Sequence, residues 1–103
     1  MEERITVYID ADLEDLIPEF LENRREDVET IRAALGREDF DLIGRLGHSM
    51  KGAGGGYGFD AITDIGRVIE EAAKTYKSEE ITTAVASLSL YLDRVDIVYE
   101  EAE

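Results

Sequence analysis

Residues 44–58 read GRLGHSMKGAGGGYG, and this stretch holds the chain's one histidine, His48, and seven of its nine glycines. Its apolar residues recur at helical spacing, so we expect a helix here. A glycine inside a helix costs about 1 kcal/mol relative to alanine. Several glycines in one helix therefore indicate a packing or functional reason for them.

The helical register decides which way His48 faces. The inward stripe of this helix runs through Ile43, Leu46, Gly47, Met50 and Gly54. At 100° per residue, His48 lies roughly 150° from the centre of the stripe, and we expect it to face solvent or a partner.

The same register divides the glycines into two groups. Gly44, Gly52 and Gly55 lie on the flank of His48, where they leave the imidazole clear. Gly47 and Gly54 lie on the core side, where we expect close approach of a neighbouring helix, the one from Ile62 to Tyr76 with Gly66.

Apolar periodicity predicts three further helices. The first begins near Ile17 after a lead-in turn over 12–16 and stops at Gly36; the histidine helix is capped by Asp39, the third by Asp60 and the fourth by Ser78. The inward stripe of the fourth is Ile81, Val85, Leu88, Leu92, Val95, Val98 and Ala102. An extended arm with Ile5, Val7 and Ile9 is expected to lie along the bundle. Short connections favour antiparallel neighbours, so the expected fold is all-α, an antiparallel four-helix bundle with a short extended N-terminal arm.

Composition limits the class of protein. We expect one domain over residues 1–103, large enough to bury a single core without disulfides or metal. There is no cysteine, the N-terminus is charged, and the longest apolar run is too short to span a bilayer, so we expect a cytoplasmic chain without membrane insertion. The net charge of -14 argues against nucleic-acid partners. Within 44–58, however, Arg45 and Lys51 are the charged residues, which predicts a locally positive window around His48.

The sequence near His48 lacks the partners of several common sites. No Asp or Glu stands three or four residues away to act as a base or an orienting carboxylate of the triad type. There is no second histidine for a metal site and no glycine-rich nucleotide loop ending in Lys-Ser or Lys-Thr. We therefore interpret His48 as a passive nucleophile whose chemistry is supplied from outside.

The stretch HSMKGAGGGYGFD, residues 48–60, resembles the signature of histidine-containing phosphotransfer (HPt) domains: His, two residues, Lys, Gly and a later glycine. The resemblance implies a four-helix bundle with its histidine midway along the second helix. It further implies that His48 accepts the phosphoryl group, that Lys51 steadies it, and that Gly52 gives the imidazole room. Gly58 matches the later glycine.

The resemblance also implies partners. His48 would exchange its phosphoryl group with the aspartate of a response-regulator receiver domain, or take part in a relay with a hybrid histidine kinase. The receiver would contribute the magnesium and the catalytic groups, so we expect no cofactor on this chain, a phosphocarrier and not an enzyme. We expect a monomer whose partner contacts Gly44, Arg45 and Gly55.

Two alternatives come from other classes of protein. A helical adaptor that is not phosphorylated would use its acidic surface to bind a basic partner, and its glycines would serve packing alone. A calcium-binding loop over Asp10, Asp12, Glu14 and Asp15 fails on spacing, because its sixth position is Asp15 instead of glycine and its twelfth is Leu21 instead of glutamate.

Overall fold

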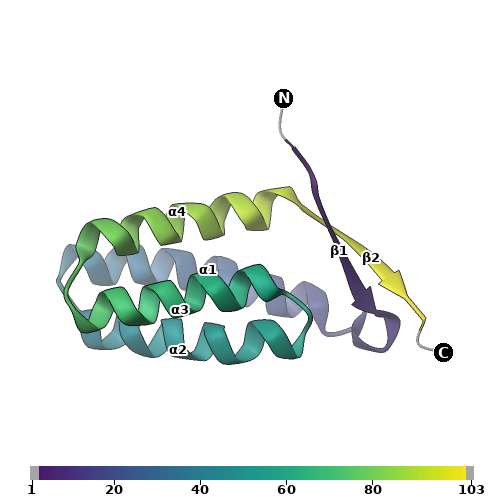
Figure 1. Ribbon diagram of the computed structural model, residues 1–103, viewed down its shortest axis with the longest axis horizontal. Coiled ribbons are helices and arrows are strands. Elements are labelled where there is room, and N and C mark those ends of the chain that lie inside the picture. The colour runs from purple at the N-terminus through teal and green to yellow at the C-terminus, as the bar shows by residue number, and fades with distance from the viewer. Residues whose placement is uncertain (1–2, 102–103) are drawn as a thin grey trace.

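A computed structural model describes residues 3–101. Its elements in chain order are the strand β1 (Ile5–Asp10), the 3-10 turn η1 (Ala11–Leu13), the helices α1 (Ile17–Gly36), α2 (Phe40–Gly56), α3 (Asp60–Lys74) and α4 (Ser78–Arg94), and the strand β2 (Val95–Glu100). The four helices lie side by side as a bundle, and the two strands cross one end of it (Figure 1). The predicted number of helices is confirmed, and α1 begins at Ile17 as expected.

All four helices contribute to one core. No helix within residues 3–101 has the length and apolarity needed to cross a membrane. The largest fully buried side chains come from every helix, from β1 and from the loop before α3: Ile9, Ile17, Ile31, Ile43, Met50, Phe59, Ile62, Ile69, Ile81, Val85 and Leu88.

The three loops between the helices adopt the same backbone conformation. Each loop has three residues, 37–39, 57–59 and 75–77. The middle residue has a positive φ in every case: 57° at Glu38, 91° at Gly58 and 56° at Tyr76. The last residue of each loop donates its amide to a carbonyl five positions back, at 2.8 to 2.9 Å. These are the bonds of a helix C-cap closed by a left-handed residue, which is usually glycine.

Two of the predicted helix caps are wrong by one position. Asp39 caps α2 as expected, since its side chain accepts from the amide of Leu42 at 3.2 Å. Asp60 and Ser78, however, are the first residues of α3 and α4, and neither cap position has a side-chain bond. At α3 the cap position is Phe59, whose ring is completely buried. Core packing and the preceding loop therefore determine where this helix begins.

The predicted fourth helix is too long. It ends at Arg94, and Val95 and Val98, which we placed on its inward stripe, belong to β2; Ala102 lies outside the described residues. β2 pairs in parallel with β1, with Ile5 opposite Val95. The arm is thus extended as expected, but it pairs with a strand at one end of the bundle instead of lying along it (Figure 1). The cause is the alternation in VDIVYE, where Val95, Ile97 and Tyr99 are half-buried and Val98 is exposed.

The backbones of α2 and α3 come very close together. A Cβ atom added to Gly47 would lie 2.9 Å from the carbonyl oxygen of Gly66, and one added to Gly66 would lie 2.6 Å from the amide nitrogen of Lys51. A Cβ on Gly54 would lie 2.7 Å from Oγ1 of Thr63. These distances confirm that Gly47 and Gly54 serve packing against the helix that contains Gly66.

We predict that Gly47→Ala lowers the free energy of unfolding by about 1–3 kcal/mol, because the new methyl group meets the α3 backbone. Gly52 is the matched control, since a Cβ there meets nothing within 4 Å. Gly52→Ala is expected to leave stability unchanged or raise it by up to about 1 kcal/mol. Chemical denaturation of the two variants measures both effects, and equal stabilities would contradict the packing argument.

Candidate functional site

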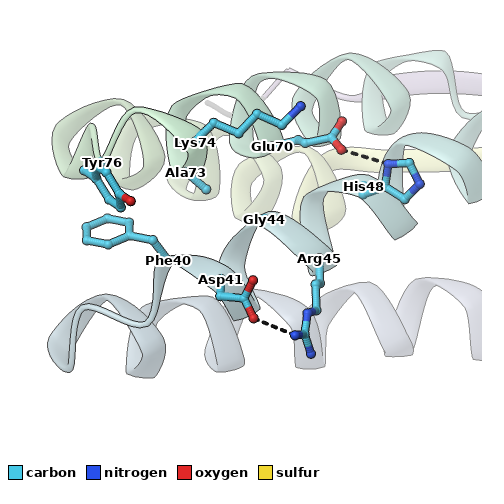
Figure 2. A pocket seen from close by; sticks show the side chains of 9 residues that line it. All are labelled: Phe40, Asp41, Gly44, Arg45, His48, Glu70, Ala73, Lys74 and Tyr76. Atoms are coloured by element: carbon cyan, nitrogen blue, oxygen red, sulfur yellow. Dashed lines mark hydrogen bonds and ion pairs between the residues drawn. The ribbon is translucent and has the colours of Figure 1, made fainter.

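His48 projects from the exposed side of α2, as the register predicts. Its side chain is 70% exposed. Its Nδ1 atom lies 2.8 Å from Oε2 of Glu70, a residue of α3 (Figure 2). The imidazole is therefore accessible to a partner and is held at one nitrogen by the neighbouring helix.

Glu70 binds a second group at the same time. The ammonium of Lys51 donates to Oε1 of Glu70 at 2.8 Å, so one carboxylate uses its two oxygens for the two side chains. Glu70 is only 13% exposed. A carboxylate so enclosed and doubly bonded has little freedom to rotate, and it fixes both the imidazole and the ammonium.

The charge on Glu70 determines which imidazole nitrogen carries the proton. The hydrogen bond from Lys51 holds the pKa of Glu70 below its ordinary value, the bond to His48 acts in the same direction, and desolvation opposes them. Glu70 is thus ionised at neutral pH and can only accept hydrogen bonds. Nδ1 of His48 must then donate its proton to Glu70. In the neutral ring this leaves the lone pair on Nε2, and no hydrogen bond among residues 3–101 occupies that atom.

The predicted positive window around His48 is corrected by the structure. Lys51 is paired with Glu70, and Arg45 is paired with Asp41 at 2.6 Å. Both carboxylates lie outside residues 44–58, so counting charges within that stretch could not reveal them.

Glu70 is the functional residue that sequence reasoning missed. The sequence within one turn of His48 holds no carboxylate, whereas Glu70 is 22 residues away. A signal was nevertheless present. Gly66 was predicted to face α2, and Glu70 follows it by one helical turn on the same face of α3. A carboxylate beside His48 could have been inferred from that register.

The other predicted site residues occupy different surroundings. Gly44 lines a hollow of about 560 Å³ between α2 and α3, together with Arg45 and His48. Gly52 faces open space, since a Cβ there would meet nothing within 4 Å. Gly55 does not line this hollow; a Cβ there would lie 3.5 Å from Oγ1 of Thr63. Within residues 3–101 there is no cluster of three or more His, Cys, Asp or Glu side chains that could hold a metal ion.

Comparison with protein families gives one match. The family model described as "Hpt domain" matches residues 15–97. This range includes all four helices in full, and it leaves out β1 and the end of β2. No curated protein and no solved structure matches the chain. The match includes His48, Lys51 and Glu70.

We predict that Glu70→Ala changes the tautomer of His48. With the acceptor removed, the proton is no longer held on Nδ1, and the population with the proton on Nε2 increases. Nitrogen-15 chemical shifts of the ring at neutral pH report the two populations. Glu71→Ala is the control, because Glu71 is the exposed neighbour of Glu70 and its side chain makes no hydrogen bond or ion pair within residues 3–101. Identical ring spectra for wild type and Glu70→Ala would contradict the assigned role of Glu70.

Proposed function

Because the chain belongs to the Hpt domain family, which serves histidine phosphotransfer in two-component phosphorelays, we propose that His48 carries the phosphoryl group and exchanges it with an aspartate of a receiver domain. The observation that carries this proposal is the exposed imidazole whose Nδ1 is bound to Glu70. With Nδ1 bound to Glu70 (Figure 2), Nε2 is the ring nitrogen left to act as the nucleophile, and the exposure of the side chain supports access by another protein.

The proposed transfer step uses this geometry. The lone pair of Nε2 attacks the phosphorus of an aspartyl phosphate on the receiver. A phosphorus–nitrogen bond forms, the phosphorus–oxygen bond to the aspartate breaks, and the electron pair leaves with the receiver's carboxylate. The Nδ1 proton stays hydrogen-bonded to Glu70, whose negative charge offsets the positive charge that develops on the ring. Magnesium and the other catalytic groups would come from the receiver, so this chain acts as a carrier.

Lys51 is proposed to steady the phosphoryl group. Its ammonium already lies in the same cluster as the imidazole, linked to it through Glu70. The lysine stem is flexible, and its head has three donors, so it can contact a phosphoryl oxygen while retaining a bond to the carboxylate. A phosphohistidine brings close to two negative charges, and Lys51 would offset part of that charge.

We infer an antiparallel order for the helices that support this site. Each connection is only three residues long, which favours antiparallel neighbours. In this arrangement α2 and α3 form a single docking face, because His48 and Lys51 come from one helix and Glu70 from the other. A receiver, or the kinase that supplies the relay, would dock on this face.

The adaptor alternative has less support. It accounts for the acidic surface, but it gives no reason for an exposed histidine whose ring is held by a nearly buried carboxylate. Labelling with phosphate separates the two functions, because an adaptor would not accept the label.

We predict that His48→Gln abolishes acceptance of a phosphoryl group from a phosphorylated receiver. Glutamine has no ring nitrogen that can act as the nucleophile, and the side chain is exposed, so the melting temperature should hardly change. The measurement is transfer of acid-labile phosphate from receivers of the same organism charged with acetyl phosphate. Undiminished labelling of His48→Gln would refute the assignment.

We predict that Gly52→Leu slows transfer more than it lowers stability. The new side chain meets no atom within 4 Å at its Cβ, but it crowds the approach to the imidazole. Gly56→Leu is the control, because Gly56 is the other α2 glycine with nothing within 4 Å and lies about two helical turns from His48, one turn beyond Gly52. Transfer rates and unfolding curves are compared for both variants. Equal transfer rates for wild type and Gly52→Leu would show that clearance beside His48 is unimportant.

A further inference from the structure

The hollow beside His48 has a polar end and an aromatic end. Its volume is about 560 Å³, and it extends from His48 and Lys74 to Phe40 and Tyr76 (Figure 2). The rings of Phe40 and Tyr76 meet edge to face, with their centroids 5.2 Å apart. His48 follows Phe40 by eight residues on α2, so the aromatic end lies about 12 Å along the helix from the imidazole.

Tyr76 is an unusual residue for its position. It is the left-handed middle residue of the loop 75–77, with φ 56°, a conformation that strains any residue with a Cβ and most of all a bulky one. The equivalent position after α2 is Gly58. Tyr76 is nevertheless 72% exposed, so its ring is not required to fill the core. A strained and exposed aromatic side chain at the rim of a hollow indicates a binding role.

We propose that the Phe40–Tyr76 pair selects the receiver by binding an apolar side chain on its surface; this inference rests on the proposed function of His48. A receiver that brings its aspartyl phosphate to Nε2 must cover the hollow, because His48 itself lines it. A typical protein interface buries about 800 Å² on each partner, which is wide enough to include a contact about 12 Å from its reactive centre. The exposed ring of Tyr76, packed on the half-buried Phe40, then offers an apolar anchor at the far end of the hollow that His48 lines.

The charged residues that line the hollow indicate which other group the partner should present. Lys74 lines it and has no ion pair within residues 3–101. Arg45, the other cation on this rim, is already bound to Asp41. The lining also holds two carboxylates, Asp41 and Glu70, so Lys74 is the cation of this lining that is left to pair with a partner's carboxylate. The fitting receiver surface therefore has an apolar side chain for Tyr76 and a carboxylate for Lys74.

The test measures transfer as a function of receiver concentration. Receivers of the same organism that label the wild type are used with wild type, Tyr76→Gly, Tyr76→Asn, Tyr76→Phe and Glu38→Gly. Glycine and asparagine tolerate the left-handed backbone, so both remove the ring without straining the loop. For Tyr76→Gly and Tyr76→Asn, the receiver concentration at half-maximal rate should rise about tenfold, with little change in the maximal rate.

Four controls separate an effect on docking from effects on chemistry and on folding. Tyr76→Phe keeps the ring and should behave as wild type, as should Glu38→Gly, which makes the same backbone change in the loop 37–39. Labelling of His48 by phosphoramidate, a donor too small to use the aromatic pair, should be equal in all variants. Thermal unfolding verifies that each variant is folded.

The outcomes are distinguishable from failure of the proposed function. If receivers label the wild type on His48 and Tyr76→Gly has the same half-saturating concentration, the inference on Tyr76 is wrong and the function of His48 stands. A parallel loss of phosphoramidate labelling in Tyr76→Gly and Tyr76→Asn also overturns the inference, because the effect would then act through His48 itself. If no receiver labels the wild type, the proposed function and this inference fail together.

Discussion

The approach of the α2 and α3 backbones at Gly47 and Gly66 determines where the groups of the site lie. Neither position has room for a Cβ, so the two helices are closer than ordinary side chains would allow. A hydrogen bond also joins the two helices near this contact, because the hydroxyl of Thr63 donates to the carbonyl of Lys51 at 3.1 Å. Glu70, one turn after Gly66, is thereby brought within hydrogen-bond distance of both the imidazole and the ammonium on α2. If the two helix axes were further apart, the carboxylate of Glu70 could not reach either the imidazole or the ammonium.

The orientation of His48 was predicted from the sequence, but its carboxylate partner, Glu70, was not. Register within one helix depends on a local repeat of 100° per residue, so the inward stripe through Ile43 and Met50 is enough to place His48 outside. The position of Glu70 depends on how far apart and at what rotation two helices pack. That information lies in small residues on both helices, and it becomes readable only when Gly47 and Gly66 are treated as a pair. The predicted positive window around His48 was wrong for a similar reason. Asp41 and Glu70, which pair with its two cations, lie outside residues 44–58.

The two terminal strands show a second limit of local patterns. Val95 and Val98 continue a helical spacing, while Val95, Ile97 and Tyr99 follow an alternating one, and the same six residues permit both. The strand is chosen because the extended arm at Ile5–Asp10 offers a parallel partner. The two segments are about ninety residues apart, so the hydrogen bonds that decide between helix and strand are tertiary. His48, Lys51 and Glu70 lie on α2 and α3 and not on either strand, which explains why the function could be proposed despite this error.

The shared carboxylate gives the site a property that separate contacts would not provide. Before transfer, Glu70 binds the ammonium of Lys51 and holds the proton on Nδ1 of His48, so no hydrogen bond among residues 3–101 occupies Nε2. In the proposed phosphorylated state, the same carboxylate and the new phosphoryl group both attract the ammonium of Lys51. Lys51 can move between them without a large change in burial, because its side chain is 36% exposed. The two states then differ by a small displacement of one flexible cation, and a small difference between states suits a carrier that must both accept and release its group.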